Sequence, residues 1–248
     1  MLNTELEQII NHKLNSELLQ DYIPNGLQVE GIRDVKRIVT GVTACQELLD
    51  IAVMQHADAI IVHHGYFWKK DSLVINGIKR KRLKTLLANN INLYAWHLPL
   101  DTHPELGNNA QLAMKLGIKV TGILLSPMVP KGEFIIPISG NLLQKKIEKA
   151  MNRPVLHYSN NAPKYIQKLA WCSGCGQDFL EYAALSGMNA FISGEASEQT
   201  IHIASEMGIH FYAAGHHATE LGGISALGEW LTKQYNLNIN FIDIDNPV

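Results

Sequence analysis

Apolar residues occur along the chain in two patterns, as short continuous runs and at helical spacing. Continuous runs are typical of strands that are buried on both faces. They predict strands at 37–43, 59–62, 92–96, 166–172, 190–193, 210–214 and 239–244. Apolar residues three or four positions apart predict helices at 4–14, 44–55, 79–89, 108–116, 142–151, 178–186, 197–207 and 218–234.

Local signals set the expected ends of several elements. Thr4 and Glu7 have the spacing of a capping box, and Thr43 is a candidate N-cap for the helix that follows it. Gly117 is expected to end the helix before it. Residues 121–140 are rich in proline and glycine, so we interpret them as the join between two halves of the chain.

Strands alternate with helices, which predicts βαβ units and therefore an α/β fold class. The expected sheets are mixed, mostly parallel and flanked by helices. Both halves repeat one element order, and residues 58–63 resemble 189–194. We therefore expect a duplication, with a first α/β repeat at 1–122 and a second at 123–248.

Composition narrows the class of protein. With 248 residues, 46% of them hydrophobic and 18% charged, the chain can bury a large core and is not a disordered protein. A net charge of −2 does not call for nucleic acid or a membrane as partner. The start of the chain lacks the features of a signal peptide, and no apolar run approaches membrane-spanning length. We expect a soluble cytoplasmic protein whose three cysteines are reduced.

Histidine is the unusual component of this composition. Six of the 11 histidines fall in three short segments, at 63–64, 97–103 and 216–217. Each segment follows a predicted strand, and in open α/β sheets the functional site lies beyond the carboxyl ends of the strands. His97 with Asp101 and His216 with Glu220 share the spacing His-x-x-x-carboxylate, one pair in each half.

Imidazole and carboxylate together form a ligand set for Zn, Mn, Fe or Ni. The candidate metal ligands are His63, His64, Asp101, His216 and Glu220. One tetrahedral ion needs three protein ligands and a water, whereas five ligands with a bridging carboxylate suit two divalent ions about 3.5–4 Å apart. His97 would be a sixth ligand, a neighbour of the ligands or a catalytic proton carrier.

Simpler interpretations remain open for some of these residues. Asp101 could cap a helix, and His216 with Glu220 could be a surface pair on one helical turn. His103 and His217 are expected to face solvent. Glu195 could line the same cavity as the ligands or be an acid at a helix start.

Three further motifs give weaker signals. Cys172 and Cys175 form a CxxC without a second pair, which favours a tight loop over a redox or zinc site. The loop 173–176 could offer backbone N–H groups to an anion. The basic run 79–84 is expected to be a solvated helix face, with contact to phosphate or to DNA as the alternative.

Several motifs together resemble the Nif-three-like family over the whole chain. They are Ile-Val-His63-His64-Gly65, His97-x-x-x-Asp101, Leu106-Gly-Asn-Asn109, Ser193-Gly-Glu195 and Gly215-His216-x-x-x-Glu220. The resemblance implies two intertwined α/β halves and a hexameric ring whose dinuclear metal sites face a central cavity. It also implies that the five candidate ligands hold the two ions, with Glu220 bridging. Cys175 departs from the family pattern, which has glycine there.

Members of that family are commonly labelled GTP cyclohydrolase type 2 homologues. The first hypothesis is therefore a metal-dependent hydrolase that opens the ring of a purine nucleotide at C8 and releases formate, with His97 moving a proton. The second is a two-metal phosphatase or nuclease acting on phosphate esters. The third is a non-enzymatic, ring-shaped interaction or regulatory protein that metals stabilise.

Overall fold

A computed structural model of the protein describes residues 1–248. The chain forms two compact units, and each contains a mixed sheet flanked by helices, which confirms the predicted fold class. The first unit comprises Met1–Leu106 and Gly223–Asp245, and the second comprises Gly107–Gly222 and Asn246–Val248. These bounds differ from the predicted repeats at 1–122 and 123–248, because 107–122 packs in the second unit and 223–245 in the first.

The first unit is built on a five-stranded sheet with the order β1-β4-β3-β2-β11. Its strands are β1 (Gly26–Val29), β2 (Arg37–Thr43), β3 (Ala59–His64), β4 (Asn92–Ala95) and β11 (Asn238–Phe241). β4, β3, β2 and β11 are parallel to one another, whereas β1 is an edge strand antiparallel to β4. The parallel order brings the ends of β3 and β4 to the same edge of the sheet.

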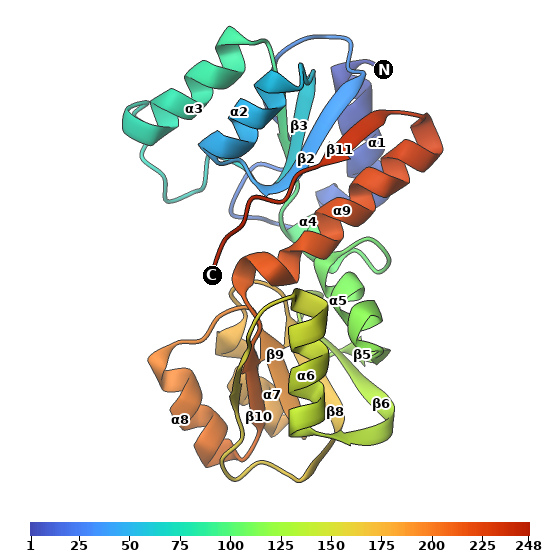
Figure 1. The fold of residues 1–248 in the computed structure, drawn as a ribbon, viewed down its shortest axis with the longest axis vertical. Helices are drawn as coiled ribbons and strands as arrows, with labels where there is room; N and C mark the ends of the chain where they lie inside the picture. Colours follow the sequence, from blue (N-terminus) through green and yellow to red (C-terminus); the bar gives the residue numbers. More distant parts are fainter. The chain divides into compact units, whose positions relative to one another are not determined.

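Helices cover both faces of this sheet (Figure 1). They are α1 (Asn3–Leu14), η1 (Ser16–Leu18), α2 (Gln46–Met54), α3 (Gly77–Ala88), α4 (Leu98–Thr102) and the end of α9 (His216–Tyr235). Leu48 of α2 and Leu86 of α3 pack with Ile60 in one core cluster. On the other face, Tyr94 and Trp96 reach α1, where the Tyr94 hydroxyl donates to Asn3 O.

The second unit is built on a six-stranded sheet with the order β5-β6-β8-β9-β10-β7. Its strands are β5 (Lys119–Ile123), β6 (Pro130–Ser139), β7 (Leu156–Tyr158), β8 (Tyr165–Cys172), β9 (Ala190–Ser193) and β10 (His210–Ala213). β8, β9 and β10 are parallel, and the other three strands pair antiparallel.

Two helix layers enclose this second sheet. The helices are α5 (Asn108–Leu116), α6 (Gly140–Met151), η2 (Gln177–Phe179), α7 (Leu180–Leu185), α8 (Glu198–Met207) and the start of α9. Leu112 of α5 and Leu143 of α6 pack with Trp171 on one face. Leu180 of α7 and Ala204 of α8 belong to the core cluster of the opposite face.

Some local predictions were wrong. α1 begins at Asn3, and its N-cap is Leu2. The Leu2 N–H donates to the carboxylate of Glu5, not of Glu7. Glu7 accepts instead from the Leu27 N–H at 2.8 Å and so ties α1 to β1. Thr43 ends β2 and does not cap a helix, because α2 begins three residues later at Gln46.

The segment predicted to join two halves is part of the second sheet. β5 and β6 pair antiparallel within it, and β6 pairs in turn with β8. Gly122 lies in β5, an exposed edge strand, Pro130 is the first residue of β6, and Pro137 lies where the β6–β8 register shifts. These are positions at which strands tolerate glycine and proline. None of the helices combines the length and hydropathy needed to cross a membrane.

Candidate functional site

The first cluster of candidate residues lies at the carboxyl ends of β3 and β4. His63 and His64 are the last two residues of β3, because its pairing with β2 continues to His64 opposite Thr43. The prediction that they follow the strand was wrong by two residues. His97 caps the short helix α4, and Asp101 lies inside that helix. Asp101 is therefore not a helix cap.

These side chains lie within ligand distance of one another. The rings of His63 and His64 are 4.5 Å apart between centroids, and His97 lies 5.1 Å from His63 and 5.7 Å from His64. One ring nitrogen from each of the three lies within 4.8 Å of those of the others. His63 Nε2 is 3.5 Å from Asp101 Oδ1, and both side chains are buried.

Each of these three histidine rings has a hydrogen-bond partner at its Nδ1 atom. His63 Nδ1 lies 3.0 Å from the Trp96 carbonyl oxygen, which can only accept, so Nδ1 carries the proton and Nε2 carries the lone pair. His97 Nδ1 lies 2.8 Å from the Asp21 carboxylate, with the same consequence. His64 Nδ1 contacts the Thr43 hydroxyl at 3.2 Å. Such outer partners are typical of metal-binding histidines.

Asp21 organises the loop that holds His97. Its carboxylate accepts from the Leu98 N–H at 2.8 Å and from the Asn25 amide at 3.0 Å. Burial alone would raise the pKa of Asp21, but the hydrogen bonds from His97, Asn25 and Leu98 outweigh it and lower that pKa from 3.8 to about 2. Asp21 therefore stays ionised and holds the His97 ring in one orientation.

The second cluster lies at the carboxyl ends of β8, β9 and β10 in the second unit. His216 begins α9, and its Nε2 lies 3.2 Å from Glu220 one turn later. His216 Nδ1 lies 2.5 Å from Glu195, which follows β9. Glu220 is 3% exposed, so the alternative of a surface pair was wrong. Glu195 does not start a helix, because α8 begins at Glu198.

The two carboxylates dominate the electrostatics of His216. Burial alone would lower its pKa, but Glu220 and Glu195 outweigh it and raise that pKa from 6.5 to about 9. His216 is thus embedded in negative charge that a bound cation would also neutralise. This favours a cation at the Nε2 and Glu220 side of the ring.

Gly174 has no side chain, and this leaves space for the side chains of His216 and Glu220. A Cβ at Gly174 would lie 3.1 Å from His216 Nε2 and in hard contact with a Glu220 oxygen. Its φ of +61° is also in the left-handed region, which glycine adopts without strain. A side chain at position 174 would therefore displace both candidate ligands.

The loop 173–176 was predicted to offer N–H groups to an anion. Its amides are instead used within the unit. The Gly174 N–H donates to the Thr219 hydroxyl at 2.9 Å, and the Gly176 N–H donates to the Ser193 hydroxyl at 3.0 Å. The Ser173 N–H donates to the Asn109 side chain. The loop therefore positions Gly174 beneath the His216 cluster, and the anion prediction was wrong.

The remaining histidines of the three segments have structural contacts. His103 was expected to face solvent but is buried, and its Nδ1 accepts the N–H groups of Glu105 and Leu106. Burial lowers its pKa. The backbone N–H of His217 donates to the Val248 carbonyl at 3.0 Å and so holds the end of the chain.

The donor set tests whether a metal fits. Borderline divalent ions bind neutral imidazole nitrogen and carboxylate oxygen, and both clusters carry these side chains in buried or half-buried positions. At His216 the ion would take the place of the proton that Glu220 and Glu195 hold on the ring. His63, His64, His97 and Asp101 could ligate from the first cluster, and His216 with Glu220 from the second. The residues therefore fit a metal, and both clusters include the outer partners that hold imidazole ligands.

A protein-family model described as Duf34/NIF3 (NGG1p interacting factor 3) matches residues 1–247. The chain belongs to this family. The match confirms the resemblance seen in the sequence motifs. A family relative from Escherichia coli K12, named "GTP cyclohydrolase 1 type 2 homolog", is 62% identical over 247 residues that cover all of both chains. One from Yersinia pestis with the same name is 59% identical over the same extent.

Solved structures of similar proteins share this Duf34/NIF3 fold. The structure titled "protein ybgI, unknown function" is 62% identical, covers all of both chains and superposes with a TM-score of 0.98. TTHA1606 from Thermus thermophilus is 31% identical over all of both chains, with a TM-score of 0.90. HcgD from Methanocaldococcus jannaschii, 24% identical over 99% of this chain and 98% of its own, shares the fold with a TM-score of 0.85.

Proposed function

We propose that this Duf34/NIF3 protein is a hydrolase that uses two divalent metal ions to act on a purine nucleotide. The observation that carries the proposal is the set of buried imidazoles and carboxylates at strand ends, with outer groups fixing the rings. The name shared by its curated relatives, GTP cyclohydrolase 1 type 2 homolog, supports a guanine nucleotide as the substrate. One water would add at C8 and open the imidazole ring of guanine to a formamide, and a second water would hydrolyse that formamide to release formate.

The proposed ligands are His63, His64, Asp101, His216 and Glu220. Neither cluster alone has enough ligands for two ions at about three protein ligands each. The proposal therefore includes the sequence-based expectation that both repeats supply one pair of ions, with Glu220 bridging. Zn, Mn, Fe and Ni all suit this borderline donor set.

When bound, such ions lower the pKa of coordinated water and polarise the bond to be broken. His97 is the proposed proton carrier. Its Nδ1–H is held by the ionised Asp21 carboxylate, which leaves Nε2 as the nitrogen that can accept a proton, in a ring 5.1 Å from that of His63. Accepting a proton at Nε2 would place a positive charge next to Asp21, which stabilises it.

The test is the reaction itself. Purified protein with GTP and Mn²⁺ or Zn²⁺ is expected to release formate and to develop the fluorescence of a pterin product. The His97→Ala variant should keep its metal content, measured by elemental analysis, and lose most of the turnover. Phosphate release with an unchanged base would assign a phosphatase instead. No product with any divalent ion would refute hydrolysis of GTP.

We further propose that the chain assembles with copies of itself into the hexameric ring that the family resemblance implies. Large apolar side chains on its surface support self-association, among them Ile135 and Ile136 of β6, which are 85% and 76% exposed. Light scattering during size-exclusion chromatography should give the mass of six chains. A monomer at micromolar concentration would contradict this proposal.

A further inference from the structure

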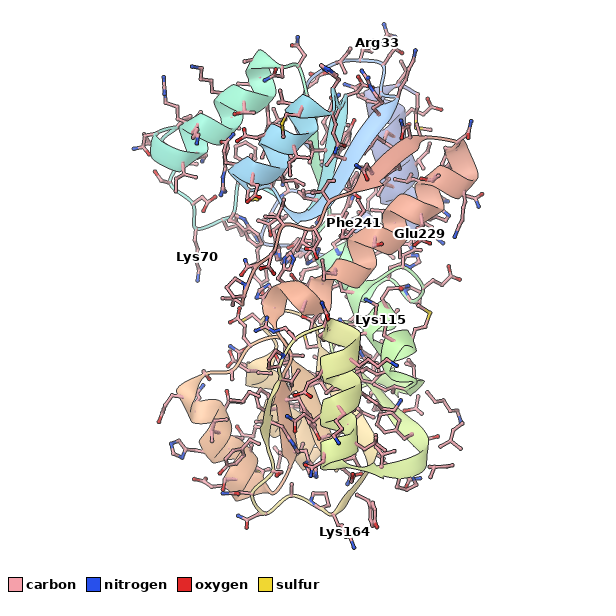
Figure 2. The ribbon with its side chains drawn as sticks, in the orientation of Figure 1. Arg33, Lys70, Lys115, Lys164, Glu229 and Phe241 are labelled. Atoms are coloured by element: carbon pink, nitrogen blue, oxygen red, sulfur yellow. The ribbon has the colours of Figure 1, made fainter.

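A cavity in the first unit lies between the loop after β3 and the start of α3. Its volume is about 620 Å³, within the range of small-molecule sites. Tyr66 and Trp68 line it from the loop, and Lys79 and Arg82 line it from α3. Figure 2 shows the loop, with the Lys70 side chain extending from it into solvent.

The basic run of α3 divides into two faces. Lys79 and Arg82 are three residues apart, so they lie on one side of the helix, and both are half-buried at the cavity wall. Arg80, Lys81 and Lys84 are exposed and do not line the cavity. The sequence prediction of a solvated face therefore describes three of these cations, and the other two face a cavity.

The two cations are held in place before any ligand binds. Lys79 Nζ donates to the Ser72 carbonyl at 2.7 Å and lies 5.5 Å from the centre of the Phe67 ring. The Arg82 guanidinium lies 6.0 Å from the centre of the Tyr66 ring. Arg82 Nε is buried and has no hydrogen-bond acceptor. Burial thus fixes the inner part of the guanidinium, and an anion in the cavity would meet the remaining N–H groups of Arg82.

Trp68 connects this cavity to the histidine cluster. Its ring contacts the His97 ring edge to face at 5.0 Å between centroids and lies 6.0 Å from His64. The indole N–H donates to the Gly65 carbonyl, and the Trp68 backbone N–H donates to Asp71. The indole is thus fixed between the cations and the candidate metal ligands. Asp71, the acidic residue of the lining, is engaged with the loop backbone.

We propose that this cavity binds a nucleotide, with its phosphate groups on Lys79 and Arg82 and its base against Trp68 beside the histidine cluster. Two fixed cations suit the charge of a phosphate chain, and the face or edge of an indole suits a heterocycle. The reaction at the base rests on the function proposed above. Binding in the cavity rests on the cavity residues alone.

The test is calorimetric titration of GTP into the chelator-treated, metal-free protein. Lys79→Ala and Arg82→Ala are each expected to weaken binding about tenfold or more, because each removes a charged phosphate contact. Arg80→Ala and Lys81→Ala remove the same charge from the exposed face of the same helix. These matched controls should bind GTP within about twofold of the wild type, given the weak effect of screened surface charges.

A second probe separates phosphate from base. Inorganic tripolyphosphate should compete with GTP and lose affinity in Lys79→Ala. Trp68→Ala should weaken GTP binding but leave tripolyphosphate binding unchanged. Arg82→Lys, which keeps a cation of similar length, should fold with the wild-type melting temperature and retain part of the affinity, which excludes misfolding as the cause of the loss.

Each outcome decides the proposal. Equal weakening by all four alanine variants would indicate diffuse attraction and overturn it, as would an absence of GTP binding to the wild type. If the expected pattern appears while no formate or phosphate is released with any metal, the nucleotide site stands and the proposed hydrolysis fails.

Discussion

At the scale of single residues, Asp21 determines what His97 can do. Its carboxylate holds the ring through Nδ1 and is itself kept ionised by the Leu98 and Asn25 N–H groups. His63 receives the same constraint from a backbone carbonyl. Asp21 therefore fixes both the orientation of the His97 ring and the proton on its Nδ1, as the Trp96 carbonyl does for His63.

Asp21→Asn is expected to keep the wild-type metal content and to lower kcat for the proposed reaction about 10–100-fold. The amide cannot stabilise the protonated ring and allows the wrong tautomer. Steady-state kinetics with elemental analysis measure both quantities. Asp34→Asn, the same exchange at an exposed position, is the control. An unchanged kcat in Asp21→Asn would remove His97 from the proton transfer.

Gly174→Ala is expected to destabilise the second unit and to lower metal binding. The Cβ meets Glu220 and His216, and the left-handed backbone alone costs about 1 kcal/mol or more. Gly187→Ala shares the left-handed φ, at +74°, but its Cβ meets nothing within 4 Å. Both variants should lose melting temperature, while metal content should fall in Gly174→Ala alone. Normal metal content in Gly174→Ala would contradict a role for that contact.

The pair His157 and His210 gives the fold a pH dependence. Their rings are joined at 3.0 Å between Nε2 and Nδ1, and burial together with His210 lowers the pKa of His157 from 6.5 to about 4. The folded state thus holds His157 neutral. Its contribution to stability is complete above pH 6.5 and is lost as pH falls toward 4, where the unfolded chain binds the proton more readily.

His157→Phe should weaken this pH dependence, because the ring still stacks on Tyr212 and no longer titrates. After allowance for partial solvent exposure, the effect between pH 7 and pH 5 is about 1 kcal/mol. Wild-type melting temperature should therefore fall about 2–4 °C further than that of the variant over this interval. Equal falls measured by circular dichroism would contradict the linkage.

At the scale of elements, strands and helices were predicted best where their apolar residues are buried against neighbouring elements. The bounds of β2, β9 and α5 were predicted to the residue, because each has a clear apolar pattern and a defined stop. β1, β5, β6 and β7 were missed or taken as a join. Three of them, β1, β5 and β7, are edge strands, whose half-exposed residues carry no continuous apolar run.

The candidate site shows the same limit. Histidines and carboxylates at predicted strand ends could be found from their spacing, and the structure brings them together within each unit. The sequence did not identify the roles of Asp21, Trp68 and Gly174, because those roles depend on partners far along the chain. Asp21 meets His97 across 76 positions, and Gly174 meets Thr219 across 45. No local pattern encodes such contacts.

Helix α6 offers a matched test of its buried face. Leu143 is fully buried in the core cluster of the second unit, whereas its neighbour Leu142 is 46% exposed. Leu143→Ala should cost about 2–5 kcal/mol of unfolding free energy, and Leu142→Ala less than about 1 kcal/mol. Denaturant titration of both variants measures the difference. Similar costs would mean that α6 packs differently.

At the scale of the whole molecule, neither half of the sequence contains a complete unit. β11, near the end of the chain, pairs with β2, and β5, from the first half, pairs with β6. A division at residue 122 would therefore remove one strand from each sheet. This exchange of strands explains why the compact units and the predicted repeats have different bounds.

The fragments 1–122 and 123–248, expressed separately, are expected not to give cooperative unfolding transitions. Each leaves an apolar sheet edge and an unfilled core face. Mixing the two fragments should restore a transition and the native circular dichroism spectrum. An isolated fragment that melts cooperatively would show that the exchanged strands are dispensable.

The pairing of β11 with β2 also sets an order of events during synthesis. β2 leaves the ribosome about 200 residues before its partner strand, which at about 5–20 residues per second is a delay of roughly 10–40 s. The second unit is almost continuous in sequence, from Gly107 to Gly222, and can fold during that delay. Until β11 is synthesised the first unit is incomplete, and the unpaired edge of β2 can pair with other chains. A nascent chain stalled before residue 238 is therefore the species that a chaperone would need to protect.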